Sequence, residues 1–196
     1  MTETIDFYFD VGSPASYLAW TQLPALAERT GVEIRWKPML LGGVFKATGN
    51  QSPAMIPAKS RYTRLDMERF ARIYGVPLNF NPHFPVNTLV LMRGAVAYRD
   101  TPDFHRYLDV VFNAMWVDEK NLNDPGTAVS VLQQAGFDAE DVLARCDDAS
   151  VKAELKRLTE EAIGRGVFGA PTFFAGDEMF FGQDRLPQLE QHINAR

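Results

Sequence analysis

The chain has 196 residues, of which 46% are hydrophobic and 23% charged, and its formal net charge is −5. This composition is typical of a globular protein with a sizeable core. No basic stretch recurs along a face and no apolar run approaches the roughly 18 residues of a membrane-spanning helix, so neither nucleic acid nor a membrane is an expected partner. Cys146 is the single cysteine and the N-terminus does not resemble a signal peptide, which together predict a cytoplasmic protein.

The start of the chain predicts a β-α-β unit. Residues 5–10 are mostly apolar and aromatic, which is typical of a buried strand. Ser13 and Pro14 then open a helix, because serine is a preferred N-cap and proline fits the first helical position. The helix ends near Gly31, and residues 32–37 alternate as a second strand.

The middle of the chain shows little strand pattern and predicts a helical block. Gly42, Gly43 and the segment 49–53 are expected to form turns or loops. Helical spacing is found over residues 59–74, 88–98, 104–116, 126–134, 139–146 and 150–163.

The end of the chain returns to strands. Residues 168–174 predict a short apolar strand, and Gly176 with Asp177 predicts a hairpin turn to a return strand over 178–181. A turn at 182–185 then leads into a closing helix.

The two ends together predict an α/β fold with the order β-α-β … β-β-α and a large all-helical insertion. Residues 1–41 and 164–196 are expected to form one discontinuous domain, and residues 42–163 the helical insertion domain.

The segment Ser13-Pro14-Ala15-Ser16 lies between the first strand and the first helix. The free N–H groups and the positive dipole end of a helix start stabilise an anion such as a thiolate. Serine at both ends of the segment rules out disulfide exchange by the chain itself. The Ser13 hydroxyl can instead donate a hydrogen bond to a thiolate brought by another molecule. The alternative is that Ser13 is an N-cap only.

Two further segments are candidate ligand contacts. Pro171 is either an ordinary residue at the start of a strand or a cis-proline, a form found in about 5–6% of X–Pro bonds. A turn at Gly182 that opens a helix exposes backbone N–H groups, and Asp184 adds a carboxylate. That pair suits a ligand with a carboxylate and an ammonium group, such as a γ-glutamyl moiety. The alternative is a helix N-cap aspartate beside a solvated Arg185.

Four stretches resemble the family that comprises the kappa-class glutathione transferases and the 2-hydroxychromene-2-carboxylate isomerases. They are residues 7–14, residues 41–50 with Pro53, Ala54, Met55, Lys59 and Tyr62, residues 168–172, and residues 181–186. They follow one another in order along nearly the whole chain. The resemblance implies a thioredoxin-like fold with a helical insertion, glutathione as the cofactor, and usually a homodimer.

The resemblance also implies roles for individual residues. Ser13 matches the serine that faces the glutathione sulfur. Ala170 matches the residue before the cis-proline of thioredoxin-like folds, whose backbone holds the cysteinyl part. The γ-glutamyl site corresponds to Gly182, Gln183, Asp184 and Arg185.

Four other residues match less central positions. Asn50 and Lys59 match polar residues near the glutathione in kappa-type enzymes, although Asn50 also fits a plain loop residue and Lys59 a solvated helix start. Phe84 and Asn87 lie in the region that supplies the second-substrate pocket of the isomerases, where Phe84 stands in place of a tyrosine.

The activity implied is that of an isomerase, in which the glutathione thiolate adds reversibly to a conjugated aromatic α-keto acid. Residues 42–62 look closer to the kappa-type transferases, in which the thiolate attacks an electrophile and stays attached. A redox-inactive binding module on the same fold is a third reading, but it needs no γ-glutamyl site, and Asp184 and Arg185 argue against it. The spacing of the three histidines indicates no metal site.

Overall fold

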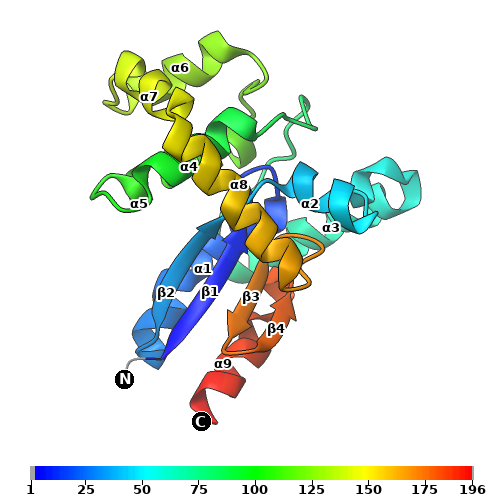
Figure 1. Cartoon of the computed structure of the whole chain (residues 1–196). Helices are drawn as coiled ribbons and strands as arrows, with labels where there is room; N and C mark the ends of the chain where they lie inside the picture. The colour runs from blue at the N-terminus through cyan, green and yellow to red at the C-terminus, as the bar shows by residue number, and fades with distance from the viewer. Residues whose placement is uncertain (1–2, 196) are drawn as a thin grey trace.

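The computed structural model describes residues 3–195 (Figure 1). Four strands form one sheet in the order β2-β1-β3-β4. The strands are β1 (Thr4–Phe9), β2 (Glu33–Pro38), β3 (Thr172–Ala175) and β4 (Glu178–Phe181). β1 runs parallel to β2, and β3 runs antiparallel to both β1 and β4. The two ends of the chain therefore build one mixed sheet, which confirms the predicted order of elements.

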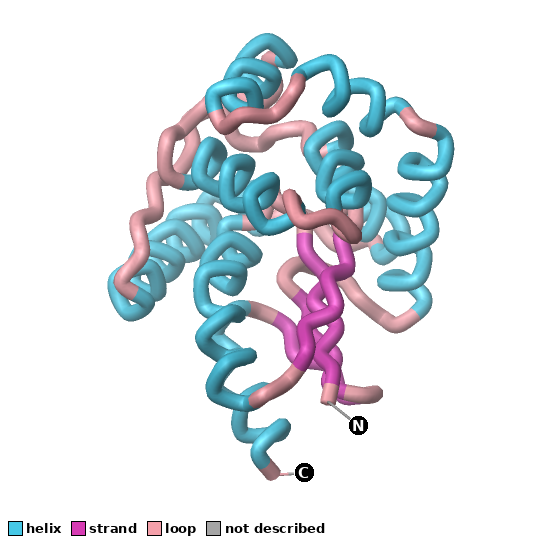
Figure 2. Tube along the Cα trace, turned by 90° about the vertical axis from the view of Figure 1, so that its left-hand side faces the viewer, coloured by secondary structure: helices cyan, strands magenta, loops and turns pink. Residues whose placement is uncertain are grey.

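Helices cover the sheet and form most of the remaining structure. They are α1 (Pro14–Thr30), α2 (Leu41–Thr48), α3 (Pro57–Tyr74), α4 (Leu89–Tyr98), α5 (Phe104–Trp116), α6 (Pro125–Gln134), α7 (Ala139–Asp147), α8 (Ala149–Gly164) and α9 (Leu186–Asn194), with short 3-10 turns η1 (Pro53–Met55) and η2 (Gln183–Arg185). Figure 2 shows most of them beside and above one end of the sheet, while both chain ends lie at its other end. Within residues 3–195, no helix is long and apolar enough to cross a bilayer.

The central strand β1 is buried on both faces. Ile5, Phe7 and Phe9 belong to a large apolar cluster that continues through α1 and α9 into the helices of the middle segment. Tyr8, which points the other way because side chains alternate along a strand, belongs to a smaller cluster with residues of α2 and α8, such as Ala162. The larger cluster contains residues from both sides of the predicted domain boundaries, which fall after residues 41 and 163. The division into two domains therefore stays a prediction.

Two local predictions are wrong. The segment at Gly42 and Gly43 is not a loop but the first turn of α2. The Asp10 carboxylate accepts the Leu41 N–H at 2.8 Å, and a Cβ on Gly43 would come within 3.2 Å of the Thr159 methyl group on α8. Tertiary contacts thus start this helix in spite of the low helix propensity of glycine.

The strand expected over residues 168–174 begins only at Thr172. Residues 169–171 form a bend, because the Ala170 carbonyl is bonded to Ser13 and Gly169 lies against the Phe181 ring, where a Cβ would come within 2.7 Å of a ring carbon. The hairpin turn at Gly176 and Asp177 is confirmed, since Ala175 pairs with Glu178.

Candidate functional site

The site is built around the start of α1. Ser13 is the N-cap, with φ −98° and ψ 117°, and its Oγ accepts the Ser16 N–H at 3.1 Å. The same hydroxyl donates to the Ala170 carbonyl oxygen at 3.0 Å. The capping role inferred from the sequence is therefore present, and the hydroxyl also joins the helix start to a segment far along the chain.

A buried carboxylate supports the turn that presents Ser13. Asp10 is 1% exposed and accepts three hydrogen bonds: from the Gly12 N–H at 2.9 Å, the Leu41 N–H at 2.8 Å and the Thr88 hydroxyl at 3.0 Å. Burial raises the pKa of Asp10, and the three hydrogen bonds oppose that rise. Asp10 thereby ties the end of β1 to the starts of α2 and α4.

The Ala170 segment is held from two sides. The Ala170–Pro171 peptide bond is cis. The Asn50 side-chain amide donates to the Phe168 carbonyl at 2.7 Å, and the Gly182 N–H donates to the Pro171 carbonyl at 3.0 Å. The Ala170 N–H donates to no group within residues 3–195. It is therefore free to bind a ligand.

The turn after β4 presents a second set of polar groups. Gly182 has φ 101° and ψ 150°, a backbone conformation almost restricted to glycine, and the Asp184 carboxylate folds back over it. The N–H groups of Gln183 and Asp184 donate to nothing in the described part of the chain. Arg185 lies 3.7 Å from the Asp184 carboxylate. Two free donors and a half-exposed carboxylate thus lie together in one turn.

Tyr74 supports this turn, although no sequence motif predicts that role. The Tyr74 hydroxyl at the end of α3 donates to the Gln183 carbonyl at 3.0 Å. Burial, followed by the nearby charge of Asp184, raises the pKa of Tyr74 to about 12. A tyrosine directly before the helix-ending Gly75 is the only pattern that marks the position. Asp10 is likewise recognisable in sequence only as an acid at the end of an apolar strand.

The structure brings some of the predicted residues together and leaves others apart. Ser13, Ala170, Asn50 and the turn at Gly182–Arg185 are linked by the hydrogen bonds given above. Lys59 is exposed on the first turn of α3 and contacts none of them.

Among the described residues, the two expected at the second-substrate pocket make no hydrogen bond or ring contact with the Ser13 turn. Phe84 packs against Trp116 with ring centroids 5.9 Å apart, and the Trp116 indole N–H donates to the Val11 carbonyl at 2.8 Å. Phe84 therefore reaches the turn before α1 only through Trp116. Asn87 is exposed, and its backbone N–H donates to the Asn123 side chain.

These groups fit a γ-glutamyl-cysteinyl thiol. The Ser13 hydroxyl and the N-terminus of α1 suit a thiolate, because both offer positive charge to an anion. The free N–H of Ala170 suits a peptide carbonyl, as when a strand is added to a sheet edge. The free N–H groups of Gln183 and Asp184 suit a carboxylate, and the Asp184 carboxylate suits an ammonium group.

Comparison with known proteins identifies the family of the chain. Residues 4–194 match the family model of the DsbA-like thioredoxin domain, and the chain belongs to that family. It shares 37% identity over 197 residues with the 2-hydroxychromene-2-carboxylate isomerase of Pseudomonas sp. (strain C18), covering 96% of this chain and 89% of the relative. It is 27% identical to glutathione S-transferase kappa 1 of Rattus norvegicus, over 94% and 88% of the two chains.

A solved structure of a relative has the same fold. The 2-hydroxychromene-2-carboxylate isomerase superposes with a TM-score of 0.85 at 33% identity, covering 98% of this chain and 95% of that one. The predicted thioredoxin-like fold and the resemblance found in the sequence are therefore confirmed.

Proposed function

We propose that the protein is a glutathione-dependent isomerase of the 2-hydroxychromene-2-carboxylate isomerase type, acting on a small aromatic substrate. The observation that carries the proposal is the Ser13 turn, where a hydroxyl at a helix N-terminus meets the backbone of Ala170 at 3.0 Å. Identities of 33–37% to named isomerases, against 26–30% to kappa-class transferases, support this outcome over the transferase outcome.

When bound, glutathione supplies a thiolate nucleophile for reversible addition to a conjugated aromatic α-keto acid. Ser13 stabilises the sulfur charge by a hydrogen bond, together with the dipole of α1. Its hydroxyl donates to Ala170 in the described structure, so donating to sulfur requires it to turn away. That rotation leaves the Ala170 carbonyl free to accept the cysteinyl N–H. Asp10 keeps the turn in place during this exchange.

The remaining proposed contacts lie around these. Asp184 binds the γ-glutamyl ammonium group, and the free N–H groups of Gln183 and Asp184, with Arg185, bind the carboxylate. Gly182 gives the turn the backbone conformation that presents these groups. Asn50 holds the segment before Ala170, and Lys59 supplies a cation near the tripeptide. Phe84 and Asn87 are proposed for the second substrate. The single, buried thiol of Cys146 is in keeping with a cytoplasmic setting.

The test compares Ser13→Ala with Ser16→Ala. Both serines lie in the same helix start, but the Ser16 hydroxyl is buried and has no partner among the described residues, which makes it a matched control. Ser13→Ala is expected to lower kcat for isomerisation by about 10²–10³-fold, as does the loss of one charge-stabilising donor. It should also raise the thiol pKa of bound glutathione, measured by thiolate absorbance. Ser16→Ala should leave both values unchanged.

Three outcomes decide between the alternatives. Absence of glutathione binding at millimolar concentration, measured by calorimetry, contradicts both enzyme readings and favours a binding module. Conjugation of a chlorinated dinitrobenzene without isomerisation of a hydroxychromene carboxylate indicates a transferase. Full isomerase activity in Ser13→Ala shows that the hydroxyl plays no part.

We also propose a homodimer that forms through α3. Tyr62, Leu65 and Ile73 lie on one side of α3 and are 62%, 52% and 72% exposed, whereas Met67 and Ala71 on the opposite side are buried. Figure 1 shows α3 projecting from the body of the molecule beside α2. A helix with apolar residues on both sides leaves one of them to be covered by a partner.

A second copy of α3, packed antiparallel, fits this surface. One two-fold axis between residues 67 and 68 sets Tyr62 against the partner subunit's Ile73 and Asp66 against the partner subunit's Arg69, so the contact is self-complementary. Leu65→Glu is expected to give a monomer by light scattering, whereas Met179→Glu, an exposed position on β4, should not. Asp66→Arg should weaken the dimer and Asp66→Arg with Arg69→Asp should restore it. A dimer that survives Leu65→Glu excludes this surface.

A further inference from the structure

We propose that the helical block contains a second ligand site, an apolar cavity that binds a small aromatic molecule of one or two rings. The cavity has a volume of about 270 Å³ and lies between α4, α5, α6 and α7. Its inner wall consists of side chains that are at most 6% exposed: Leu91, Tyr107, Leu122, Leu132, Val142 and Cys146. None of these residues takes part in the proposed reaction.

The cavity is large enough to hold a small ligand. The cavity opens to solvent at its rim, and an apolar ligand that fills it would give its apolar lining van der Waals partners. An apolar cavity of about 150 Å³ in another protein stays dry and binds benzene. The cavity described here is larger than that. A single aromatic ring therefore fits with room to spare.

The inner wall presents carbon and sulfur rather than free polar atoms, and the two amide side chains of the lining, Asn87 and Asn123, belong to exposed residues at the rim. The Tyr107 hydroxyl donates to the Leu91 carbonyl at 2.9 Å, and the Cys146 thiol lies 3.6 Å from the Val90 carbonyl. Both polar groups are thus already paired with the backbone of α4. Burial raises the pKa of Cys146 to about 11, which keeps the thiol neutral. Such a wall offers no partner to a charged ligand.

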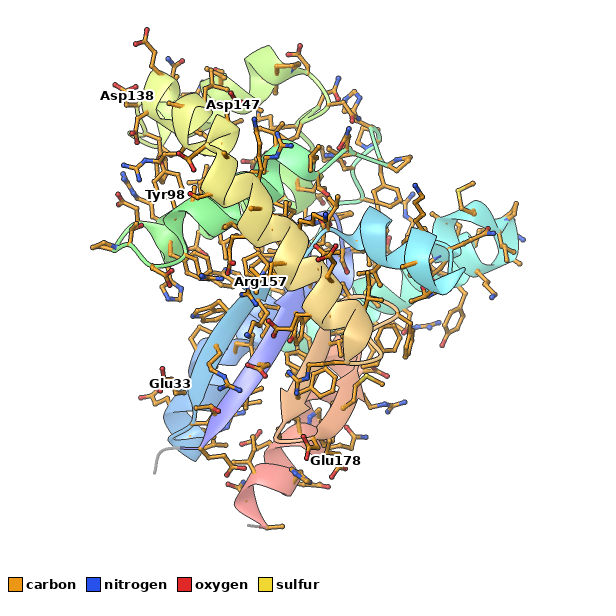
Figure 3. The ribbon with its side chains drawn as sticks, viewed as in Figure 1. Glu33, Tyr98, Asp138, Asp147, Arg157 and Glu178 are labelled. Atoms are coloured by element: carbon orange, nitrogen blue, oxygen red, sulfur yellow. The ribbon has the colours of Figure 1, made fainter. Side chains whose placement is uncertain are left out.

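The chemistry of the wall favours an aromatic ligand. The Tyr107 ring is fixed by stacking on Tyr98, which is labelled in Figure 3, with centroids 5.1 Å apart. Aromatic rings pair well edge-to-face with such a ring, and sulfur atoms such as that of Cys146 make favourable contacts with ring edges. The rim carries Val90 and Leu143, each 50% exposed, so the approach to the cavity is apolar as well.

A buried layer separates the cavity from the Ser13 turn. Met92 on α4 and Trp116 at the end of α5 are fully buried, and each contacts the backbone of Val11. On this side, the inner wall of the cavity is formed by Leu91 of α4 and Tyr107 of α5. Asn87 at the rim is the one residue shared with the proposed second-substrate pocket. The site is thus distinct from the Ser13 turn, and ligand binding there requires neither glutathione nor the aromatic substrate.

Indole and benzene are suitable probes, measured by ligand-observed NMR and by the thermal shift of the full chain. Saturable binding of indole is expected in wild type. Two variants fill the cavity from α6, Leu132→Phe and Ala128→Leu, and each should weaken indole binding at least tenfold. Met179→Phe adds comparable bulk on the exposed strand β4 and should bind indole as wild type does. Circular dichroism and glutathione binding show whether each variant is folded.

Cys146 gives an independent readout. Because its sulfur lines the cavity, bound indole should slow modification of Cys146 by a small apolar thiol reagent several-fold in wild type but not in Leu132→Phe. The proposal is overturned by absence of saturable binding, by equal binding in wild type and both filled variants, or by competition of indole with the aromatic substrate. Loss of glutathione binding alone refutes the proposed isomerase function and leaves the cavity site intact.

Discussion

Gly94, in the middle of α4, is a position where one added methyl group should destabilise the protein strongly. A Cβ placed there would overlap the Tyr107 hydroxyl and the ring carbon that bears it, and would come within 3.0 Å of a second ring carbon. Tyr107 is 1% exposed, and its hydroxyl is held by the Leu91 carbonyl at 2.9 Å. The ring therefore cannot move aside without breaking that hydrogen bond in the core.

The expected loss of stability in Gly94→Ala follows from three contributions. Overpacking of a core costs about 1–3 kcal/mol. A buried Tyr107 hydroxyl left without its partner costs about 1–3 kcal/mol more. The better helix propensity of alanine returns up to about 1 kcal/mol. The net loss is about 3 kcal/mol, a large part of the roughly 5–15 kcal/mol that stabilises a typical domain.

The measurement is the free energy of unfolding in urea. The control is Gly164→Ala at the end of α8, where a Cβ would meet nothing within 4 Å, and this variant should be as stable as wild type or up to about 1 kcal/mol more stable. Combining Gly94→Ala with Tyr107→Phe removes the overlapping oxygen, so the double variant should lose less than the sum of the single losses. A Gly94→Ala variant within about 1 kcal/mol of the control, or strictly additive losses, would refute the reasoning.

Three further predictions concern other parts of the molecule. Gly182→Ala should weaken glutathione binding at least tenfold, measured by calorimetry. The φ of 101° at this position disfavours any side chain, and the added Cβ would displace the Asp184 carboxylate. Unchanged affinity would exclude this turn from the ligand site. A hydrogen bond from Arg157, which Figure 3 labels on α8, lowers the pKa of Glu154 from 4.5 to about 2. Since the pKa of Glu154 is lower in the folded than in the unfolded chain, ionised Glu154 stabilises the fold fully above its unfolded pKa, and this stabilisation is lost as the pH falls towards 2. The loss is on the order of 1 kcal/mol after solvent screening. The free energy of unfolding of Glu154→Gln should therefore change less with pH across the acid range than that of wild type. Burial raises the pKa of Cys146 from 9.0 to about 11, so the folded chain should react with thiol reagents about a hundredfold more slowly than the urea-unfolded chain, and equal rates would contradict the burial.

The elements whose signals are local are the ones that the sequence predicts well. β1 is recognisable because it is buried on both faces and therefore almost continuously apolar. Ser13 and Pro14 mark the start of α1 by chemistry that acts within one helical turn. The hairpin at Gly176 is likewise set by the residues of the turn itself.

The features that the sequence does not predict depend on distant partners. α2 begins at two glycines only because Asp10, 31 residues away, binds its first N–H and Thr159 on α8 requires a small neighbour. Tyr74 supports the turn at Gln183 across a separation of 109 residues. No short-range sequence pattern predicts contacts between residues so far apart. The pairing of Ser13 with the Ala170 segment is expected from the resemblance to a family and not from the spacing of residues.

The pairing of β1 with β3 has a consequence for how the chain is made. Ile5 pairs with Ala175, so β1 leaves the ribosome before its partner strand, which lies 170 positions further along the chain, has been made. Until then one edge of β1 is open, and an open apolar edge strand promotes aggregation. Such distant pairing also slows folding. We therefore expect nascent chains that stop before Thr172 to need chaperone protection, although all the residues of α1–α8 are already present in them.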